Sequence, residues 1–183
     1  ALKGLSDKID PSGAAALALS GAMHSVLLLD AHDQPLGRAM TWADQRAAPQ
    51  ANALREQADN RHVYTLTGAP LVSIYYPAKL RWVQENVPTP FARVVAIKEF
   101  VLNRLTGAWV ADLGLASATG LVDLRCRCWA PEMLALAGIA PEQLLPLVDS
   151  RCVVGKLSPE TARQTGLPEG LPVVIGGSDG GMA

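Results

Sequence analysis

The chain has 183 residues, of which 49% are hydrophobic, and a formal net charge of −1 from 16 basic and 17 acidic side chains. This length and composition suit a single globular domain with a sizeable core. Because no cluster of Lys or Arg offers an electrostatic footprint for a phosphate backbone, the sequence argues against nucleic acid as a partner.

The longest uninterrupted apolar stretch runs from Gly13 to Met23. It is too short to span a bilayer, and Asp7 and Asp10 precede it, which is unlike the start of a signal peptide. We therefore predict no membrane segment, no export and a cytoplasmic location.

The three cysteines are Cys126, Cys128 and Cys152. Their odd number and irregular spacing fit neither a disulfide framework nor a zinc site, and the nearest histidine in sequence is His62. We expect reduced thiols and no metal ligands among them.

Short apolar runs alternate with longer segments of helical period, which is the pattern of an α/β or mixed α+β domain. The apolar runs predict strands over residues 14–19, 26–30, 36–42, 93–97 and 173–175. The turn sequence "DAHDQPLG" predicts that the second and third of these are antiparallel neighbours. The helical period predicts helices over residues 49–58, 77–86, 98–105, 131–137 and 159–165, four of which begin on a proline.

The stretch "TWADQRA" is a first candidate site. Trp42, Asp44 and Arg46 would share one face if the strand over 36–42 continued that far. A tryptophan ring beside a carboxylate and a guanidinium can hold a polyhydroxylated ligand. The alternative, which the residues leave open, is a core tryptophan beside a surface salt bridge.

The stretch "GGSDGG" is a sharper candidate. Glycines after a strand let the backbone approach a ligand closely, and Asp179 would stand at the end of the sheet, where open α/β sheets bind ligands. The alternative is that Ser178 or Asp179 caps the next helix. No stretch matches the lysine-bearing P-loop.

Seven motifs in register over nearly the whole chain resemble the FGGY family of carbohydrate kinases, and within it the gluconate kinases first and the xylulose kinases next. The motifs span Met23 to Asp30, Thr41 to Ala47, Thr67 to Pro70, Lys79 to Trp82, Arg104 to Gly107, Ala116 to Asp123 and Pro172 to Gly180. The resemblance implies an α/β fold of the actin-like, ribonuclease-H-like kind, incomplete at both ends. Residues 1–183 would form part of the N-terminal, sugar-binding domain. The phosphate loop would lie upstream, and the ATP-binding C-terminal domain would lie downstream.

By the same resemblance, Asp179 matches the catalytic base, and Met23, His24, Trp42 and Asp44 match positions that line the sugar pocket. The implied reaction transfers the γ-phosphate of ATP to a hydroxyl of a sugar or sugar acid, with gluconate favoured. A gluconate carboxylate would need a partner such as His24 or Arg46. ATP and Mg²⁺ would be bound mainly by parts outside this chain, so we expect the chain alone to be inactive.

Two other readings stay open at this point. The chain could be a stand-alone sugar-binding or regulatory module without kinase activity. It could also be a purely structural α/β domain in which Trp42 packs and Asp179 caps. The expected partner is a small sugar or sugar acid, and a homodimer is left open.

Overall fold

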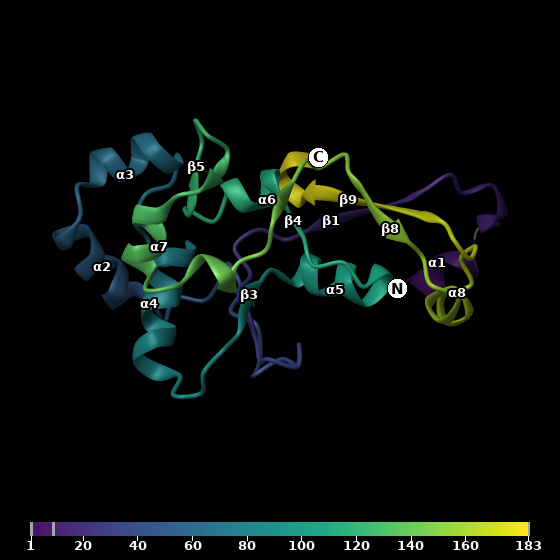
Figure 1. Ribbon diagram of the computed structural model, residues 1–183, viewed down its shortest axis with the longest axis horizontal. Helices are drawn as coiled ribbons and strands as arrows, with labels where there is room; N and C mark the ends of the chain where they lie inside the picture. The colour runs from purple at the N-terminus through teal and green to yellow at the C-terminus, as the bar shows by residue number, and fades with distance from the viewer. Residues whose placement is uncertain (1, 9, 183) are drawn as a thin grey trace.

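The computed structural model describes residues 2–8 and 10–182, which form a mixed α/β structure (Figure 1). The helices are α1 (Leu2–Ser6), α2 (Ala48–Gln57), α3 (Asn60–Thr67), α4 (Tyr76–Asn86), α5 (Ile97–Thr106), α6 (Leu113–Ser117), α7 (Pro131–Ala137), α8 (Pro159–Thr165) and α9 (Asp179–Met182), with 3-10 turns at Pro11–Gly13 and Pro141–Gln143. Within the described ranges, no helix has the length and apolar character needed to cross a membrane.

The largest sheet has the strand order β1-β9-β8, with β1 parallel to β9 and β8 antiparallel to it. The other strands form the pairs β2-β3, β4-β7 and β5-β6. The strands are β1 (Leu17–Gly21), β2 (Leu27–Leu29), β3 (Arg93–Val95), β4 (Ala111–Asp112), β5 (Val122–Asp123), β6 (Cys128–Trp129), β7 (Leu147–Val148), β8 (Val153–Lys156) and β9 (Pro172–Ser178).

The molecule is elongated, with two groups of elements at its ends (Figure 1). Helices α2, α3, α4 and α7 gather at one end around a large apolar core that includes Leu54, Leu80 and Met133. The β1-β9-β8 sheet lies toward the other end, where Leu102, Leu157 and Ile175 belong to a second core. Strand β9 points back to the middle of the molecule and ends beside α6, so its last residues lie between the two cores.

The five helices predicted from the sequence are confirmed, each to within one residue at either end. Their boundaries depend on local signals. In α8, Ser158 accepts a hydrogen bond from the N–H of Thr161 at 3.2 Å, Pro159 occupies the first turn, and Gly166 ends the helix with φ of 75°. Helix α3 was not predicted, although Asp59 caps it and Gly68 ends it in the same way.

The predicted strand over 36–42 is wrong as a strand, because this segment makes one isolated bridge, Met40 with Val26, and a second bridge joins Pro35, just before it, to Leu29. Both bridges are antiparallel, which confirms that the segment is the antiparallel neighbour of the one before it. The strand predicted over 14–19 lies instead at Leu17–Gly21, and the one predicted over 173–175 is longer, at Pro172–Ser178.

The expectation of reduced thiols is wrong for two of the cysteines, because Cys126 and Cys128 form a disulfide. Cys126 lies in the turn between β5 and β6, Cys128 is the first residue of β6, and Arg127 between them has a φ of 57°. This left-handed residue reverses the chain between the two cysteines and leaves their Cα atoms 5.4 Å apart, within the usual range for a disulfide. Cys152 is a free thiol.

Candidate functional site

Asp179 is the first residue of α9, directly after β9, and it is exposed. Its Oδ1 accepts a hydrogen bond from the N–H of Gly180 at 2.9 Å. The cap of α9 is made by Ser178, whose Oγ accepts from the N–H of Gly181 at 3.1 Å. The capping role that the sequence left open for this pair therefore belongs to Ser178, and the carboxylate of Asp179 stands at the end of the sheet.

Strand β9 carries a bulge just before this site. The register between β1 and β9 changes from Ala18 opposite Val174 to Ser20 opposite Gly177, so β9 has one extra residue. Gly176 lies in this bulge with φ of 67°, and a Cβ there would be 1.9 Å from the carbonyl oxygen of Leu19. Only glycine can occupy this position without strain. The bulge bends β9 and so sets the direction of its last residues and of Asp179 after them.

Met23 and His24 follow the end of β1 and lie against the α9 turn. The Cε methyl of Met23 is 3.0 Å from the place that a Cβ on Gly180 would take, so this methyl group packs on the glycine next to Asp179. His24 has φ of 62°, and its ring meets the ring of Tyr75 edge to face with centroids 5.0 Å apart. A non-glycine residue in the left-handed region is held there by its surroundings, as is common at binding sites.

The surroundings of His24 favour the neutral form of its imidazole. Its burial, and then the positive charge of Lys79, lower its pKa, while the backbone of Ala118 and the negative charge of Asp179 raise it less. The Nδ1 atom is buried, and among the described residues it has no hydrogen-bond partner. A buried ring nitrogen without a partner can bond to a hydroxyl or carboxylate of a ligand.

Trp42, Asp44 and Arg46 do not share a strand face, because the chain turns after Met40. The side chain of Asp44 accepts from the N–H and Nε of Arg46 at 3.1 and 2.9 Å, and the guanidinium of Arg46 lies 4.9 Å from the ring centroid of Trp82. Trp42 is 62% exposed. The salt bridge of the alternative interpretation is therefore present, but a core role for Trp42 is wrong.

Lys79 ties together the two segments that carry these residues. Its side chain is fully buried, and Nζ donates to the carbonyl of His24 at 2.5 Å and to that of Thr41 at 2.8 Å. Burial lowers the pKa of Lys79 to about 8, partly offset by the negative charge of Asp44. The ammonium group of Lys79 therefore hydrogen-bonds both to the backbone of the Met23–His24 segment and to the backbone next to Trp42.

Sequence reasoning placed Lys79 in a motif but gave it no role. Its position in α4 was a usable signal. Tyr76, Leu80 and Val83 lie on the same helix face at helical spacing, and all are buried. A lysine on an apolar helix face is an unusual position that points to a buried hydrogen-bonding role.

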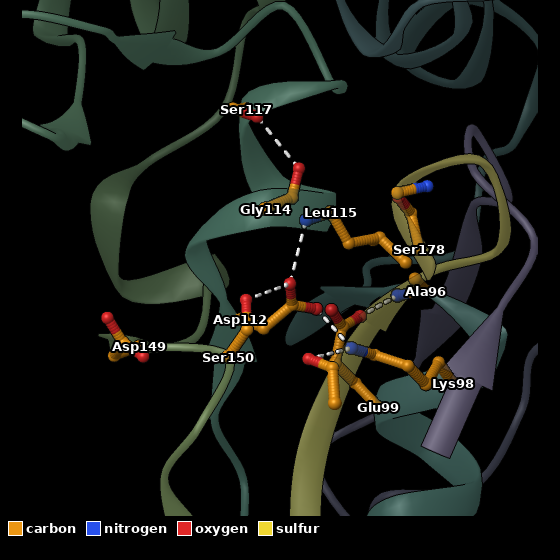
Figure 2. A network of polar contacts seen from close by, with 12 residues as sticks. Ala96, Lys98, Glu99, Asp112, Gly114, Leu115, Ser117, Asp149, Ser150 and Ser178 are labelled. Carbon is orange, nitrogen blue, oxygen red and sulfur yellow. Dashed lines mark hydrogen bonds and ion pairs between the residues drawn. The ribbon is translucent and has the colours of Figure 1, made fainter. Parts of the chain in front are cut away.

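A second buried lysine lies beneath the bulge of β9 (Figure 2). Lys98 and Asp112 form an ion pair, with side chains only 1% and 0% exposed, and Lys98 Nζ also donates to the carbonyl of Gly176 at 3.3 Å. The Oδ1 of Asp112 accepts from the N–H of Leu115 at 2.9 Å and from Ser150 Oγ at 3.2 Å. No sequence pattern indicates this pair, because its members come from different elements, α5 and β4.

Glu99, next to Lys98, is buried in the same region, and its carboxylate accepts from the N–H of Ala96 (Figure 2). Burial raises the pKa of Glu99 to about 7, and the negative charge of Asp112 adds to this rise, while the N–H of Ala96 and the charge of Lys98 oppose it. The carboxyl therefore titrates near neutral pH.

This pKa predicts a loss of stability as the pH rises. The pKa of Glu99 is about 7 in the folded protein and near 4.5 in the unfolded chain, so the folded protein binds the proton more tightly. The stabilisation that this proton provides is complete below pH 4.5 and is lost as the pH rises through about 7. Between pH 5 and pH 8 the free energy of unfolding should fall by about 2–3 kcal/mol from this group. Glu99→Gln should lack this part of the pH dependence.

The measurement is urea unfolding of both proteins at pH 5 and pH 8. His24 and Lys79, whose pKa values are lowered, are present in both, so the difference between the two proteins isolates Glu99. Parallel pH dependences for the parent and Glu99→Gln would show that Glu99 does not titrate in this range.

The chain matches the family described as "FGGY family of carbohydrate kinases, N-terminal domain" over residues 2–183. A gluconokinase of Bacillus licheniformis is 35% identical over 167 residues, which are 90% of this chain and 33% of that protein. A xylulose kinase of Escherichia coli (strain K12) is 31% identical over 182 residues, which are 98% of this chain and 37% of that protein. The chain thus spans about a third of the length of these relatives.

Solved structures agree with the sequence relatives. A gluconate kinase from Lactobacillus acidophilus superposes with a TM-score of 0.91 at 29% identity, covering 99% of this chain and 37% of that one. A xylulose kinase from Rhodospirillum rubrum gives a TM-score of 0.92 at 29% identity, covering 98% of this chain and 38% of that one. The fold is accordingly the actin-like, ribonuclease-H-like α/β fold that the resemblance implied. On the family match and these relatives together, the chain belongs to the FGGY family of carbohydrate kinases.

Proposed function

We propose that the protein carrying this chain is a kinase that transfers the γ-phosphate of ATP to a hydroxyl of a sugar acid, with gluconate as the acceptor. The observation that carries the proposal is the exposed carboxylate of Asp179 at the bulged end of β9, whose negative charge acts on His24, a residue with an unpartnered Nδ1 among the described residues. The names of the 35% identical gluconokinase and of the structurally similar gluconate kinase support gluconate over other acceptors.

In this proposal Asp179 is the general base. Phosphoryl transfer has a loose transition state, so catalysis depends mainly on positioning and electrostatics. The carboxylate of Asp179 orients the acceptor hydroxyl and takes its proton as the oxygen bonds to phosphorus. Such a base contributes about 10²–10⁴-fold to the rate.

Met23, His24, Trp42 and Asp44 hold the sugar in this proposal. The exposed indole of Trp42 offers a flat surface for the C–H face of a polyol, and the Asp44 carboxylate accepts from hydroxyl groups. His24 Nδ1, which has no partner among the described residues, accepts a hydrogen bond from a gluconate hydroxyl, and the guanidinium of Arg46, which is 51% exposed, is the cation for the gluconate carboxylate.

ATP and Mg²⁺ supply the phosphoryl group and neutralise its charge. The described part of the chain holds no group of three or more His, Cys, Asp or Glu side chains that could bind a metal ion. Kinase sites hold Mg²⁺ with one or two carboxylates and the nucleotide phosphates, so the proposal requires further contacts with nucleotide and metal from the rest of the full-length protein. The relatives, about three times as long, have room for such contacts.

The test of the proposal is phosphoryl transfer by the full-length protein. ADP formation with gluconate, xylulose and glycerol as acceptors, followed by identification of the phosphorylated product, should give the highest kcat/KM for gluconate. Binding of gluconate without ADP formation would instead support a sugar-binding module, and a preference for xylulose would overturn the choice of acceptor.

Trp42→Ala in the full-length protein should raise the sugar KM by about tenfold, which corresponds to about 1.4 kcal/mol of lost packing, and leave kcat nearly unchanged. The reason is that a ring packed on the sugar contributes equally in the ground and transition states. Tyr64→Ala is the matched control, because Tyr64 is also an exposed aromatic, at 58%, but lies on α3. Unchanged KM and kcat would place Trp42 outside the sugar site, and a large loss of kcat at constant KM would contradict its role in uniform binding.

A further inference from the structure

We propose that Lys98 and Asp112 are positioning residues that hold the bulge of β9 and thereby aim the carboxylate of Asp179. The inference rests on the proposed function, since it gives this buried pair a role in the same reaction. Neither side chain reaches the acceptor, because both are buried beneath the sheet.

Both backbone groups of Gly176 are fixed by this cluster. Its carbonyl accepts from Lys98 Nζ at 3.3 Å, and its N–H donates to the carbonyl of Ser150 at 3.1 Å. Ser150 Oγ in turn donates to Asp112 at 3.2 Å, and Asp112 is the ion-pair partner of Lys98 (Figure 2). Asp112 therefore links Lys98, which binds the carbonyl of Gly176, to Ser150, which binds its N–H. Gly176 lies three residues before Asp179.

Lys98 also contacts the strand on the other side of the site. A Cβ on Gly21, the last residue of β1, would lie 2.6 Å from the Cβ of Lys98, so the lysine stem passes directly over this glycine. Strand β1 leads into Met23 and His24, and β9 leads into Asp179. Lys98 thus contacts both β1 and β9, the two strands that lead into the residues of the proposed site.

Stability alone does not explain such a pair. Removing two charges from water is costly, and a buried ion pair can often be replaced by apolar groups without loss of stability. What an apolar pair cannot do is donate a hydrogen bond to the carbonyl of Gly176, which the left-handed bulge turns toward Lys98. The function of the pair is therefore to select one geometry of the bulge.

The test uses the double variant Lys98→Met with Asp112→Asn in the full-length protein. This change removes both charges of the ion pair together, and Asn can still accept from Leu115 and Ser150. We expect kcat to fall by about 10²-fold, since a displacement of about 1 Å at a reacting group has this effect. The sugar Kd should rise much less than kcat falls, because Trp42 and Asp44 lie outside β1 and β9, and only Met23 and His24 follow a strand that Lys98 contacts.

A second readout does not depend on catalysis. Amide hydrogen exchange in the peptide covering residues 172–181 should become faster at the bulge, while the neighbouring β8 peptide over 153–156 keeps its rate. Leu54→Ala, a buried residue of α2 in the other core, is the control for general destabilisation. It should lower the thermal midpoint without lowering kcat.

A kcat within threefold of the parent, or unchanged exchange at the bulge, would overturn the assignment of Lys98 and Asp112. So would an equal loss of kcat in Leu54→Ala. A parent enzyme that phosphorylates no sugar would overturn the proposed function instead, and the exchange rates would still decide whether the pair holds the bulge.

Discussion

Asp179→Asn in the full-length protein is expected to lower kcat by about 10²–10⁴-fold while the sugar still binds. Asparagine keeps the size of the side chain and can still accept from the N–H of Gly180, but its amide cannot take a proton from the acceptor hydroxyl. Since Ser178 makes the cap of α9, the thermal midpoint should stay within about one degree of the parent, as for a surface substitution.

The measurement is steady-state kinetics together with a thermal melt of each protein. Asp10→Asn is a matched control, because Asp10 is also an exposed carboxylate that accepts from a nearby N–H, that of Ser12 at 2.9 Å. Its turnover should equal that of the parent. Turnover of Asp179→Asn within about threefold of the parent, where a general base is worth at least 10²-fold, would remove Asp179 from the catalytic role.

Gly176→Ala should be the most destabilising single substitution among these, with a loss of about 3–5 kcal/mol in the free energy of unfolding. One part of this loss is the left-handed backbone, with φ of 67°. The larger part is steric, because the new Cβ would lie 1.9 Å from the carbonyl oxygen of Leu19 and would force β1 away from β9. Urea unfolding at one pH measures the loss.

The variant Gly107→Ala separates the backbone part of this loss of stability from the steric part. Gly107 ends α5 with φ of 79°, and a Cβ there would have no heavy atom within 4 Å. It should therefore lose only the backbone part, about 1–2 kcal/mol. Equal losses at the two glycines would show that β1 and β9 are not in close contact at the bulge.

Helix positions were predictable because their signals lie within a few residues. The prolines that open α7 and α8 and the glycines that end them act on their own turns, whatever the rest of the chain does. The strand over 36–42 was mispredicted because an apolar alternation shows that a segment is half buried but does not supply a partner for each N–H. Only Met40 forms a bridge there, with Val26.

The disulfide was also missed because it depends on the path of the chain rather than on a local signal. Counting three cysteines gave no reason to pair any of them, since pairing depends on the path of the chain between them. The hairpin of β5 and β6, with its left-handed Arg127, brings Cys126 and Cys128 together. No pattern of residue types in that stretch specifies this path.

By itself, the sequence determined the family, the five helices with clear signals and the residue types at the candidate site, because motifs and caps are local and are read directly from neighbouring residues. Only the tertiary structure decided that Lys79 and Lys98 are buried, and that they hydrogen-bond to carbonyls of His24 and Gly176. The physical reason is that a charge is buried by segments distant in sequence, which must close around it and supply its acceptors.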